Sequence, residues 1–190
     1  MRVMAIIDHP RPGSFNHAIL SAAVDGLRSA GQTVDVLDLH ADGFDPVMRV
    51  EELAVYTTGQ WLDPKVGEYQ GRLGRADYLY LVFPVWWESM PAMLKGFFDK
   101  VFLPGWAFTE ADFSPCLGHI RGATVITTMG APKAVHTSGV PALCKGTLEA
   151  CGVGPTRWIN FLEVGNVSAE QRRLWLAQVE EGARGQDALG

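Results

Sequence analysis

The chain has 190 residues, of which 47% are hydrophobic, and a formal net charge of −5. That length and composition suffice for one buried core, and because no linker-like stretch divides the chain, we expect residues 1–190 to form a single domain. The acidic balance, without a basic stripe, argues against a nucleic-acid partner. The stretch before Asp8 is too short for a signal sequence or a membrane span, so we expect a cytoplasmic protein.

The spacing of the cysteines and histidines gives no metal-binding pattern. The cysteines form neither a CxxC pair nor an even set, which favours a reducing compartment and free thiols. Four of the histidines share no HxxxH or HxH spacing and have no carboxylate cluster beside them, so we expect no metal site. The cysteines are Cys116, Cys144 and Cys151, and the four histidines are His9, His17, His40 and His119.

Strand-like runs alternate with helix-like segments from one end of the chain to the other. In chain order, the predicted elements are a strand at 2–7, a helix at 16–30, a strand at 33–38, a helix at 65–73, a strand at 78–83, a helix at 91–101, a strand at 123–128, a helix at 142–150, a strand at 156–161 and a helix at 168–182. The run at 78–83 is continuously apolar, as expected of a parallel strand that helices cover on both faces.

Capping residues mark several of the helix ends. Ser168 and Gln171 form a capping-box pattern, and Gly31 and Gly152 follow the first and fourth predicted helices as C-cap glycines.

The alternation of predicted strands and helices predicts an α/β fold with right-handed crossovers. Five strands favour a flavodoxin-like three-layer sandwich with a parallel sheet of order 2-1-3-4-5, in which a ligand lies over the first, third and fourth strands.

The loop at 8–18 follows the first strand and starts the first helix. Ser14 or Asn16 can cap this helix, and the free N–H groups at a helix N-terminus attract a phosphate. The alternative is that Ser14 is only a cap. No GxGxxG or Walker-type sequence is present, so a Rossmann dinucleotide site or a P-loop is not expected.

Two further loops follow the third and fourth strands. Residues 85–90 carry Trp86 and Trp87, and Pro91 starts the next helix. The loop at 127–139 offers threonine hydroxyls and close backbone approach at glycine for the edge of a planar ligand. It also contains His136, which can carry a proton near neutral pH or can simply be solvated.

A fourth loop at 103–110 follows the helix at 91–101. Trp106 and Phe108 are large rings in this glycine- and proline-bearing segment. They pack on the core, or they line a pocket or a dimer interface suited to flat substrates.

Three segments in this order resemble the flavodoxin-like NAD(P)H:quinone oxidoreductases of the DT-diaphorase type and their short bacterial relatives. They are HPRPGSFNHA at 9–18, FPVWWESMPAMLKGFFDKVFLPGWAF at 83–108 and TTMG at 127–130. The resemblance implies a non-covalent flavin, FAD or FMN, and a homodimer with active sites at its interface. It also implies two-electron reduction of quinone-like acceptors by NADH or NADPH.

The resemblance also assigns roles to individual residues. Those implied to contact the flavin phosphates are His9, Ser14, Phe15, Asn16 and Ala18. Those implied to line the flavin ring or bind its edge are Pro84, Val85, Trp86, Trp87, Thr127, Thr128 and Gly130. His136 matches the histidine that faces the flavin pyrimidine and would be the catalytic residue, while Glu88, Trp106 and Phe108 fall in the substrate pocket.

The chain departs from the family pattern inside the substrate pocket. Glu88 stands where an aromatic residue is common, Trp86 where glutamine is common, and Glu110 where a second aromatic residue is expected. A carboxylate beside the flavin would repel anionic substrates, so the acceptor can differ from the quinones that the family reduces.

The reaction expected from this resemblance is ping-pong hydride transfer, in which the flavin carries the chemistry. Two alternatives stay open. The first is an ancillary subunit of a glutathione-gated potassium efflux system, with a membrane protein as partner. The second is a flavodoxin-type electron carrier, which the modest acidity and the Trp106 and Phe108 loop disfavour.

Overall fold

The computed structural model describes residues 1–131 and 139–185 and contains one parallel five-stranded sheet of order β2-β1-β3-β4-β5. Its strands are β1 (Arg2–Ile7), β2 (Thr33–Asp38), β3 (Tyr78–Pro84), β4 (Ala123–Thr128) and β5 (Thr156–Phe161). The predicted order is confirmed. Only β3 differs from its predicted bounds, because Pro84 stays in register with Thr128 at the end of the strand.

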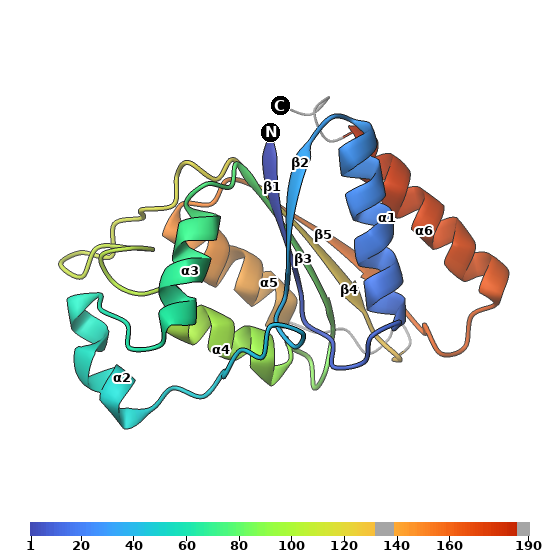
Figure 1. Cartoon of the computed structure of the whole chain (residues 1–190). Coiled ribbons are helices and arrows are strands. Elements are labelled where there is room, and N and C mark those ends of the chain that lie inside the picture. Colours follow the sequence, from blue (N-terminus) through green and yellow to red (C-terminus); the bar gives the residue numbers. More distant parts are fainter. Residues whose placement is uncertain (132–138, 186–190) are drawn as a thin grey trace.

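The helices cover both faces of the sheet and make three layers. They are α1 (Phe15–Ser29), α2 (Val50–Val55), α3 (Pro64–Leu73), α4 (Ala92–Val101), α5 (Gly139–Leu143) and α6 (Ala169–Arg184). In Figure 1, α1 and α6 lie together on one face, and α3, α4 and α5 cover the other. The predicted flavodoxin-like sandwich is confirmed, whereas the single-domain prediction for the whole chain stays a prediction.

Strand β1 shows how the sequence builds the two cores. Val3, Ala5 and Ile7 pack in the cluster beneath α1 and α6, while Met4 and Ile6 pack in the cluster beneath α3 and α4. All five side chains are at most 1% exposed. Because successive side chains of a strand point to opposite faces, a continuously apolar strand supplies both cores at once.

The predicted capping residues are confirmed, and apart from the segment at 142–150 the predicted helix bounds lie within two residues of the observed ones. The Ser168 hydroxyl accepts a hydrogen bond from the Gln171 amide at 3.1 Å, which caps α6. Gly31 follows α1 with φ of 78°, and Gly152 has φ of 97°. These positive φ values explain why glycine ends both segments.

Two helical segments differ from the sequence prediction. Helix α2 and the 3-10 turn after it, Tyr56–Thr58, were not predicted, because neither buries a residue and so neither shows an apolar period. The helix predicted at 142–150 instead consists of α5, a π-helical turn at Cys144–Leu148 and a 3-10 turn at Glu149–Cys151. Within residues 1–131 and 139–185, no helix has both the length and the apolar character needed to span a membrane.

Candidate functional site

The loops that follow β1, β3 and β4 are joined by hydrogen bonds at the carboxyl edge of the sheet. Asn16 Nδ2 donates to Thr128 Oγ1 at 3.0 Å, which ties the start of α1 to the end of β4. The Val85 amide donates to the Thr128 carbonyl at 2.8 Å, and the Gly139 amide donates to the Glu88 carbonyl at 3.1 Å. The predicted convergence of these loops is therefore observed, at the edge where open α/β sheets bind ligands.

The loop after β1 presents the N-terminus of α1. Ser14 is the N-cap residue, and its hydroxyl accepts a hydrogen bond from the His17 amide at 3.3 Å. The Ala18 amide donates to the Ser14 carbonyl at 3.1 Å as part of the first helical turn. The first amides of a helix have no acceptor within the helix, so this terminus offers N–H groups and a positive dipole end to an anion.

His9 stands between this loop and the tryptophans. Its Nδ1 accepts a hydrogen bond from the Arg11 amide at 3.1 Å, and its ring centroid lies 6.4 Å from that of Trp86. Burial, followed by repulsion from His17, lowers the pKa of His9 below its usual value. In the free protein His9 is therefore neutral at pH 7 and can gain a proton when an anion arrives.

The next two residues of this loop are held inside the protein. The Phe15 ring packs against Phe161 and Trp175, with centroids 6.5 and 6.2 Å away, beneath α6. Asn16 is 3% exposed, and its amide group is engaged with the Thr128 hydroxyl. Any contact of Phe15 with a phosphate would therefore come from its backbone, whereas Asn16 positions the loop through its side chain.

The loop after β3 is a tight turn in a strained conformation. Trp86 and Ser89 exchange two backbone hydrogen bonds, of 3.0 and 3.1 Å, around a two-residue loop. Trp87 and Glu88 at its centre have φ of 48° and 64°. Such turns usually contain Asn-Gly, and each larger residue held there costs about 1–3 kcal/mol. Strain of this kind concentrates at functional sites, so the turn is a candidate ligand clamp.

The tryptophans of this turn face outward. Trp86 is 47% exposed and Trp87 is 100% exposed, whereas Val85 just before them is 8% exposed and part of the core. Burying an aromatic ring removes a large apolar area from water, so two neighbouring indoles are seldom left uncovered without a ligand or a partner.

Gly139 approaches the strained turn after β3 so closely that only glycine fits. A Cβ atom at this position would lie 2.2 Å from the Glu88 carbonyl oxygen, closer than any side chain tolerates. Glycine therefore permits the hydrogen bond between the Gly139 amide and the Glu88 carbonyl, which fixes the turn after β3 against the start of α5.

The threonines at the end of β4 use their hydroxyl groups within the protein. Thr127 Oγ1 donates to Asn160 Oδ1 at 2.9 Å and accepts a hydrogen bond from Trp158 Nε1 at 2.8 Å. The Thr128 hydroxyl is engaged with Asn16. The backbone is engaged as well, because the Val85 amide donates to the Thr128 carbonyl and the Met129 amide donates to the Phe161 carbonyl. This leaves the backbone at Gly130 as the part of the loop that the edge of a ligand can reach. At Gly130 the space beside the backbone is open.

His136 falls within residues 132–138, outside the described residues, so its predicted catalytic role stays a prediction.

Two aspartate–histidine pairs at the carboxyl ends of β1 and β2 were missed by the sequence analysis. His40 Nε2 lies 2.8 Å from Asp8 Oδ1, and His17 Nε2 lies 3.0 Å from Asp38 Oδ2. The sequence signal that could have pointed to the first pair was Asp8 itself, a carboxylate directly after a predicted buried strand. Its partner could not be found from the sequence, because His40 lies 32 residues away on a neighbouring loop.

The two carboxylates of these pairs differ in their electrostatics. Burial raises the pKa of Asp8, which is 1% exposed, although Leu94 and His40 donate hydrogen bonds to it. Burial also acts to raise the pKa of Asp38, but hydrogen bonds from the Ala41 amide and from His17 hold it below its usual value. Asp38 is therefore the better-stabilised anion, and Asp8 depends on its few partners.

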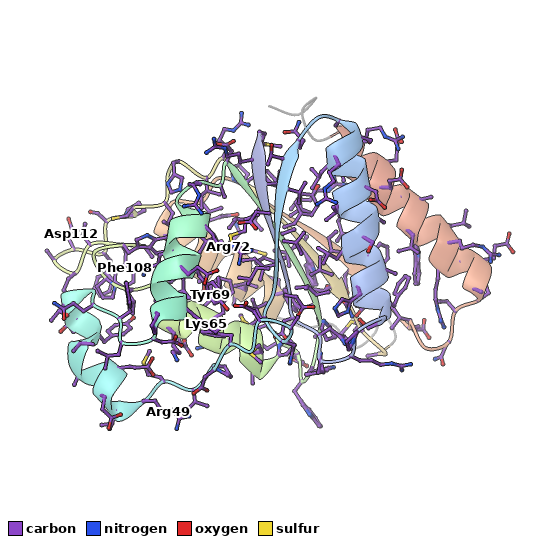
Figure 2. All side chains as sticks on the ribbon, in the orientation of Figure 1. Arg49, Lys65, Tyr69, Arg72, Phe108 and Asp112 are labelled. Carbon is purple, nitrogen blue, oxygen red and sulfur yellow. The ribbon has the colours of Figure 1, made fainter. Side chains whose placement is uncertain are left out.

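An aromatic cavity of about 350 Å³ opens on the α4 face of the sheet. Phe108 lines it and stacks on Phe113, with centroids 5.4 Å apart. Trp106 instead packs on Phe102 at 5.8 Å, and Glu88 lies in the strained turn, two residues before Met90, which lines the cavity. In Figure 2, Phe108 lies on the same side of the sheet as α3 and its labelled residues.

Among the residues that the structure describes, no group of three or more histidine, cysteine, aspartate or glutamate side chains is placed to hold a metal ion. The histidines near the loops are each engaged with a hydroxyl, an amide or a carboxylate instead.

A doubly wound parallel sheet whose carboxyl-edge loops are joined by hydrogen bonds defines an α/β protein of the flavodoxin-like class. A model of the family described as having a flavodoxin-like fold matches residues 1–181. The chain belongs to the flavodoxin-like NAD(P)H:quinone oxidoreductases, a family of enzymes.

Individual relatives agree with this assignment. Ribosyldihydronicotinamide dehydrogenase (quinone) of Pongo abelii is 30% identical over 80% of this chain and 77% of its own length. NAD(P)H dehydrogenase (quinone) 1 of Cavia porcellus is 31% identical over 80% of this chain, which spans 64% of the length of that relative. The solved NAD(P)H:quinone oxidoreductase of Methanothermobacter marburgensis is 26% identical, with a TM-score of 0.84 over 98% of this chain and 97% of its own.

Proposed function

We propose that this protein is a flavin-dependent NAD(P)H oxidoreductase that passes two electrons to quinone-like acceptors. The observation that carries the proposal is that hydrogen bonds join the loops at the carboxyl edge, so that a helix N-terminus, an exposed indole pair and the backbone after β4 lie at one edge of the sheet. These are the groups that a phosphate, an aromatic ring and a heteroatom edge require. The activities in the names of the relatives support the proposal.

The residues present fit a bound flavin. The N-terminus of α1 at Ser14–Ala18, with neutral His9 beside it, suits the phosphate. The exposed Trp86 and Trp87 suit the flat ring, and the open backbone at Gly130 suits its polar edge. When bound, the flavin supplies the hydride acceptor and the two-electron donor of the reaction. Chromatography of the released flavin distinguishes FAD from FMN.

The contribution of the protein is positioning and electrostatics. The strained turn after β3 would help to hold the flavin ring in one place against the nicotinamide, because its backbone hydrogen bonds keep it in one shape. Backbone amides after β4 would stabilise negative charge on the flavin edge, and His136 would hold the proton that accompanies it. Because a nicotinamide and a quinone both need the flavin face, they would occupy it in turn, as in a ping-pong reaction.

A second copy of the chain is part of the proposal. Phe113 is 72% exposed and stacks on Phe108 beside the aromatic cavity, which leaves an apolar surface suited to a homodimer. The acceptor would bind where this surface meets the flavin. Glu88 would disfavour anionic acceptors there through repulsion.

Spectroscopy and anaerobic reduction test the proposal. The purified protein should show flavin absorbance, and its chromatographically released flavin should be FAD or FMN. Anaerobic NADH or NADPH should bleach it directly to the two-electron-reduced form, and a quinone should restore it. A protein that binds neither flavin would contradict the proposal, and a stable semiquinone would point to a one-electron carrier instead.

A further inference from the structure

Helix α4 begins without a cap of its own. Its N-cap residue is Pro91, which has no polar side chain, and its first turn contains no acidic residue. The Leu94 amide instead donates a hydrogen bond of 2.7 Å to Asp8 Oδ2, from a residue 86 positions earlier in the chain. A carboxylate at a helix N-terminus satisfies an otherwise unpaired N–H group and interacts favourably with the helix dipole. Asp8 thus caps α4 from the end of β1.

The other oxygen of Asp8 faces His40. The distance from Asp8 Oδ1 to His40 Nε2 is 2.8 Å, and the exposed fractions of the two side chains are 1% and 28%. A buried carboxylate is retained only where it is paired, so His40 is the group that holds Asp8 in place at the helix end. The capping bond at Leu94 therefore depends on a residue in the loop after β2.

The same contacts continue to the start of α1. The His40 amide donates to Asp38 Oδ1 at 3.1 Å, Asp38 Oδ2 lies 3.0 Å from His17 Nε2, and His17 Nδ1 lies 2.9 Å from the Ser14 hydroxyl. A single chain of hydrogen-bonding groups thus runs from the N-cap of α1 to the first turn of α4. The first of these helix ends is proposed to bind the phosphate, and the second directly follows the turn proposed to bind the flavin ring.

We propose that Asp8 and His40 are positioning residues that hold the ring-binding turn at Trp86–Ser89 by fixing the N-terminus of α4. This inference rests on the proposed flavin site for its ligand, but the cap itself is a property of the free protein. The turn is strained at Trp87 and Glu88, so it keeps its shape only if both of its ends are anchored. The Gly139–Glu88 hydrogen bond anchors one side, and Asp8 anchors the helix that follows.

The test compares Asp8→Ala, Asp8→Asn and His40→Ala. Asp8→Ala removes the cap, so flavin should bind about tenfold more weakly or worse, as loss of one charge-assisted hydrogen bond implies. Asp8→Asn keeps an oxygen acceptor for Leu94 and should restore affinity to within about threefold of the wild type. Flavin dissociation constants would be measured by quenching of flavin fluorescence.

Amide hydrogen exchange gives a readout that needs no flavin. In the free protein, Asp8→Ala should speed exchange at Leu94 while amides in the last turn of α4 stay protected. The matched control is Asp35→Asn, on the same strand as Asp38 but paired with Arg72, which should leave both the Leu94 exchange and the flavin affinity unchanged. An Asp8→Ala protein with wild-type exchange at Leu94 would overturn the proposal.

A double-mutant cycle tests whether the two residues act as one unit. If His40 acts through Asp8, the Asp8→Ala/His40→Ala protein should bind flavin no more weakly than Asp8→Ala alone. Additive losses would overturn the pairing. If the alanine variants fail to fold, His40→Gln alone tests the pairing: faster exchange at Leu94 supports it, and wild-type exchange at Leu94 overturns it. A wild-type protein that binds no flavin would contradict the proposed function, while the exchange at Leu94 would still test the cap.

Discussion

The amino and carboxyl ends of β1 and β2 differ in how deeply their charged side chains are buried. At the amino end, Arg72 makes two hydrogen bonds to Asp35, at 2.7 and 3.0 Å, and 48% of the Asp35 side chain is exposed. At the carboxyl end, about 10 Å further along β2, Asp38 and the 1% exposed Asp8 are each paired with a histidine. The Asp35 carboxylate thus reaches the surface, whereas the Asp8 carboxylate at the carboxyl end is held inside the protein and Asp38 is 25% exposed.

Most of the backbone strain lies at the same end of the sheet. Among the described residues, four that are not glycine have positive φ: Trp87 and Glu88 follow β3, Glu163 follows β5, and Phe113 lies in the loop before β4. Buried charge and backbone strain both cost free energy, so their presence at one end of the sheet needs a compensating role. That role is the proposed flavin site, and each prediction below separates the carboxyl end from the rest of the molecule.

The largest effect is expected from His136→Ala. If His136 holds the proton that accompanies flavin reduction, this substitution should slow reduction by NADPH about tenfold to a thousandfold. Anaerobic stopped-flow absorbance measures the rate. The control is His119→Ala, since His119 Nε2 lies 3.4 Å from the Leu73 carbonyl at the end of α3, away from the cleft loops. A wild-type reduction rate in His136→Ala would remove the catalytic role.

A smaller effect is expected from Gly139→Ala. The new Cβ would lie 2.2 Å from the Glu88 carbonyl, so the strained turn must move, at a cost of about 1–3 kcal/mol. Flavin affinity should fall about tenfold or more, because each 1.4 kcal/mol is roughly a factor of ten. Gly182→Ala in α6 is the control: nothing lies within 4 Å of its Cβ, and unfolding should become harder by up to about 1 kcal/mol. Equal flavin affinity in the Gly139→Ala and wild-type proteins would show that this contact is not needed.

The pH dependence of flavin binding should depend on His9. Burial lowers the pKa of His9 in the free protein, whereas a bound phosphate would raise it, so binding takes up a proton. Affinity should therefore increase as the pH falls from 7 to 6, by at most about tenfold for one proton. His17 and His40 also face this region, each beside a carboxylate. The pH dependence of flavin binding by His9→Asn therefore shows whether His9 is the residue that takes up the proton. A pH dependence that persists in His9→Asn would assign the proton elsewhere.

The smallest effect is expected at the amino end. Asp35→Asn weakens an ion pair in which Asp35 is 48% exposed and Arg72 is 16% exposed, and ion pairs at the surface contribute about 0–1 kcal/mol to the free energy of unfolding. Urea denaturation should show this small loss, reduced further by salt, while the flavin dissociation constant stays at the wild-type value. A large change in flavin affinity would show that the two ends of the sheet are coupled.

The sheet was predictable because its signals are local. Strands β1 and β3 are apolar runs, as Tyr78–Pro84 illustrates, and the edge strands β2 and β5 are short runs that mix apolar and polar residues. Helix α6 is marked by the Ser168 cap. Helix α2 escaped because no residue in it is buried, so its sequence carries no apolar period. The split of the segment at 139–151 into three helical types depends on packing that a sequence pattern does not encode.

The candidate site was predictable in its loops but not in its contacts. The alternation of elements placed Ser14, Trp86 and Thr128 at one edge before any geometry was known. The partners of the buried side chains were not predictable, because the Asp8–His40 and Thr127–Trp158 contacts join residues 32 and 31 positions apart. Such pairings depend on the register and spacing of folded strands, which single-sequence patterns leave open.

The central claim is that the carboxyl edge of the sheet binds flavin. The most direct test is titration of FMN and of FAD with the flavin-free wild-type, Gly139→Ala and Asp35→Asn proteins. Quenching of flavin fluorescence reports the binding. We predict saturable binding of at least one flavin by the wild type, equal binding by Asp35→Asn and weaker binding by Gly139→Ala. Absence of binding by the wild type, or equal binding by all three proteins, would contradict the claim.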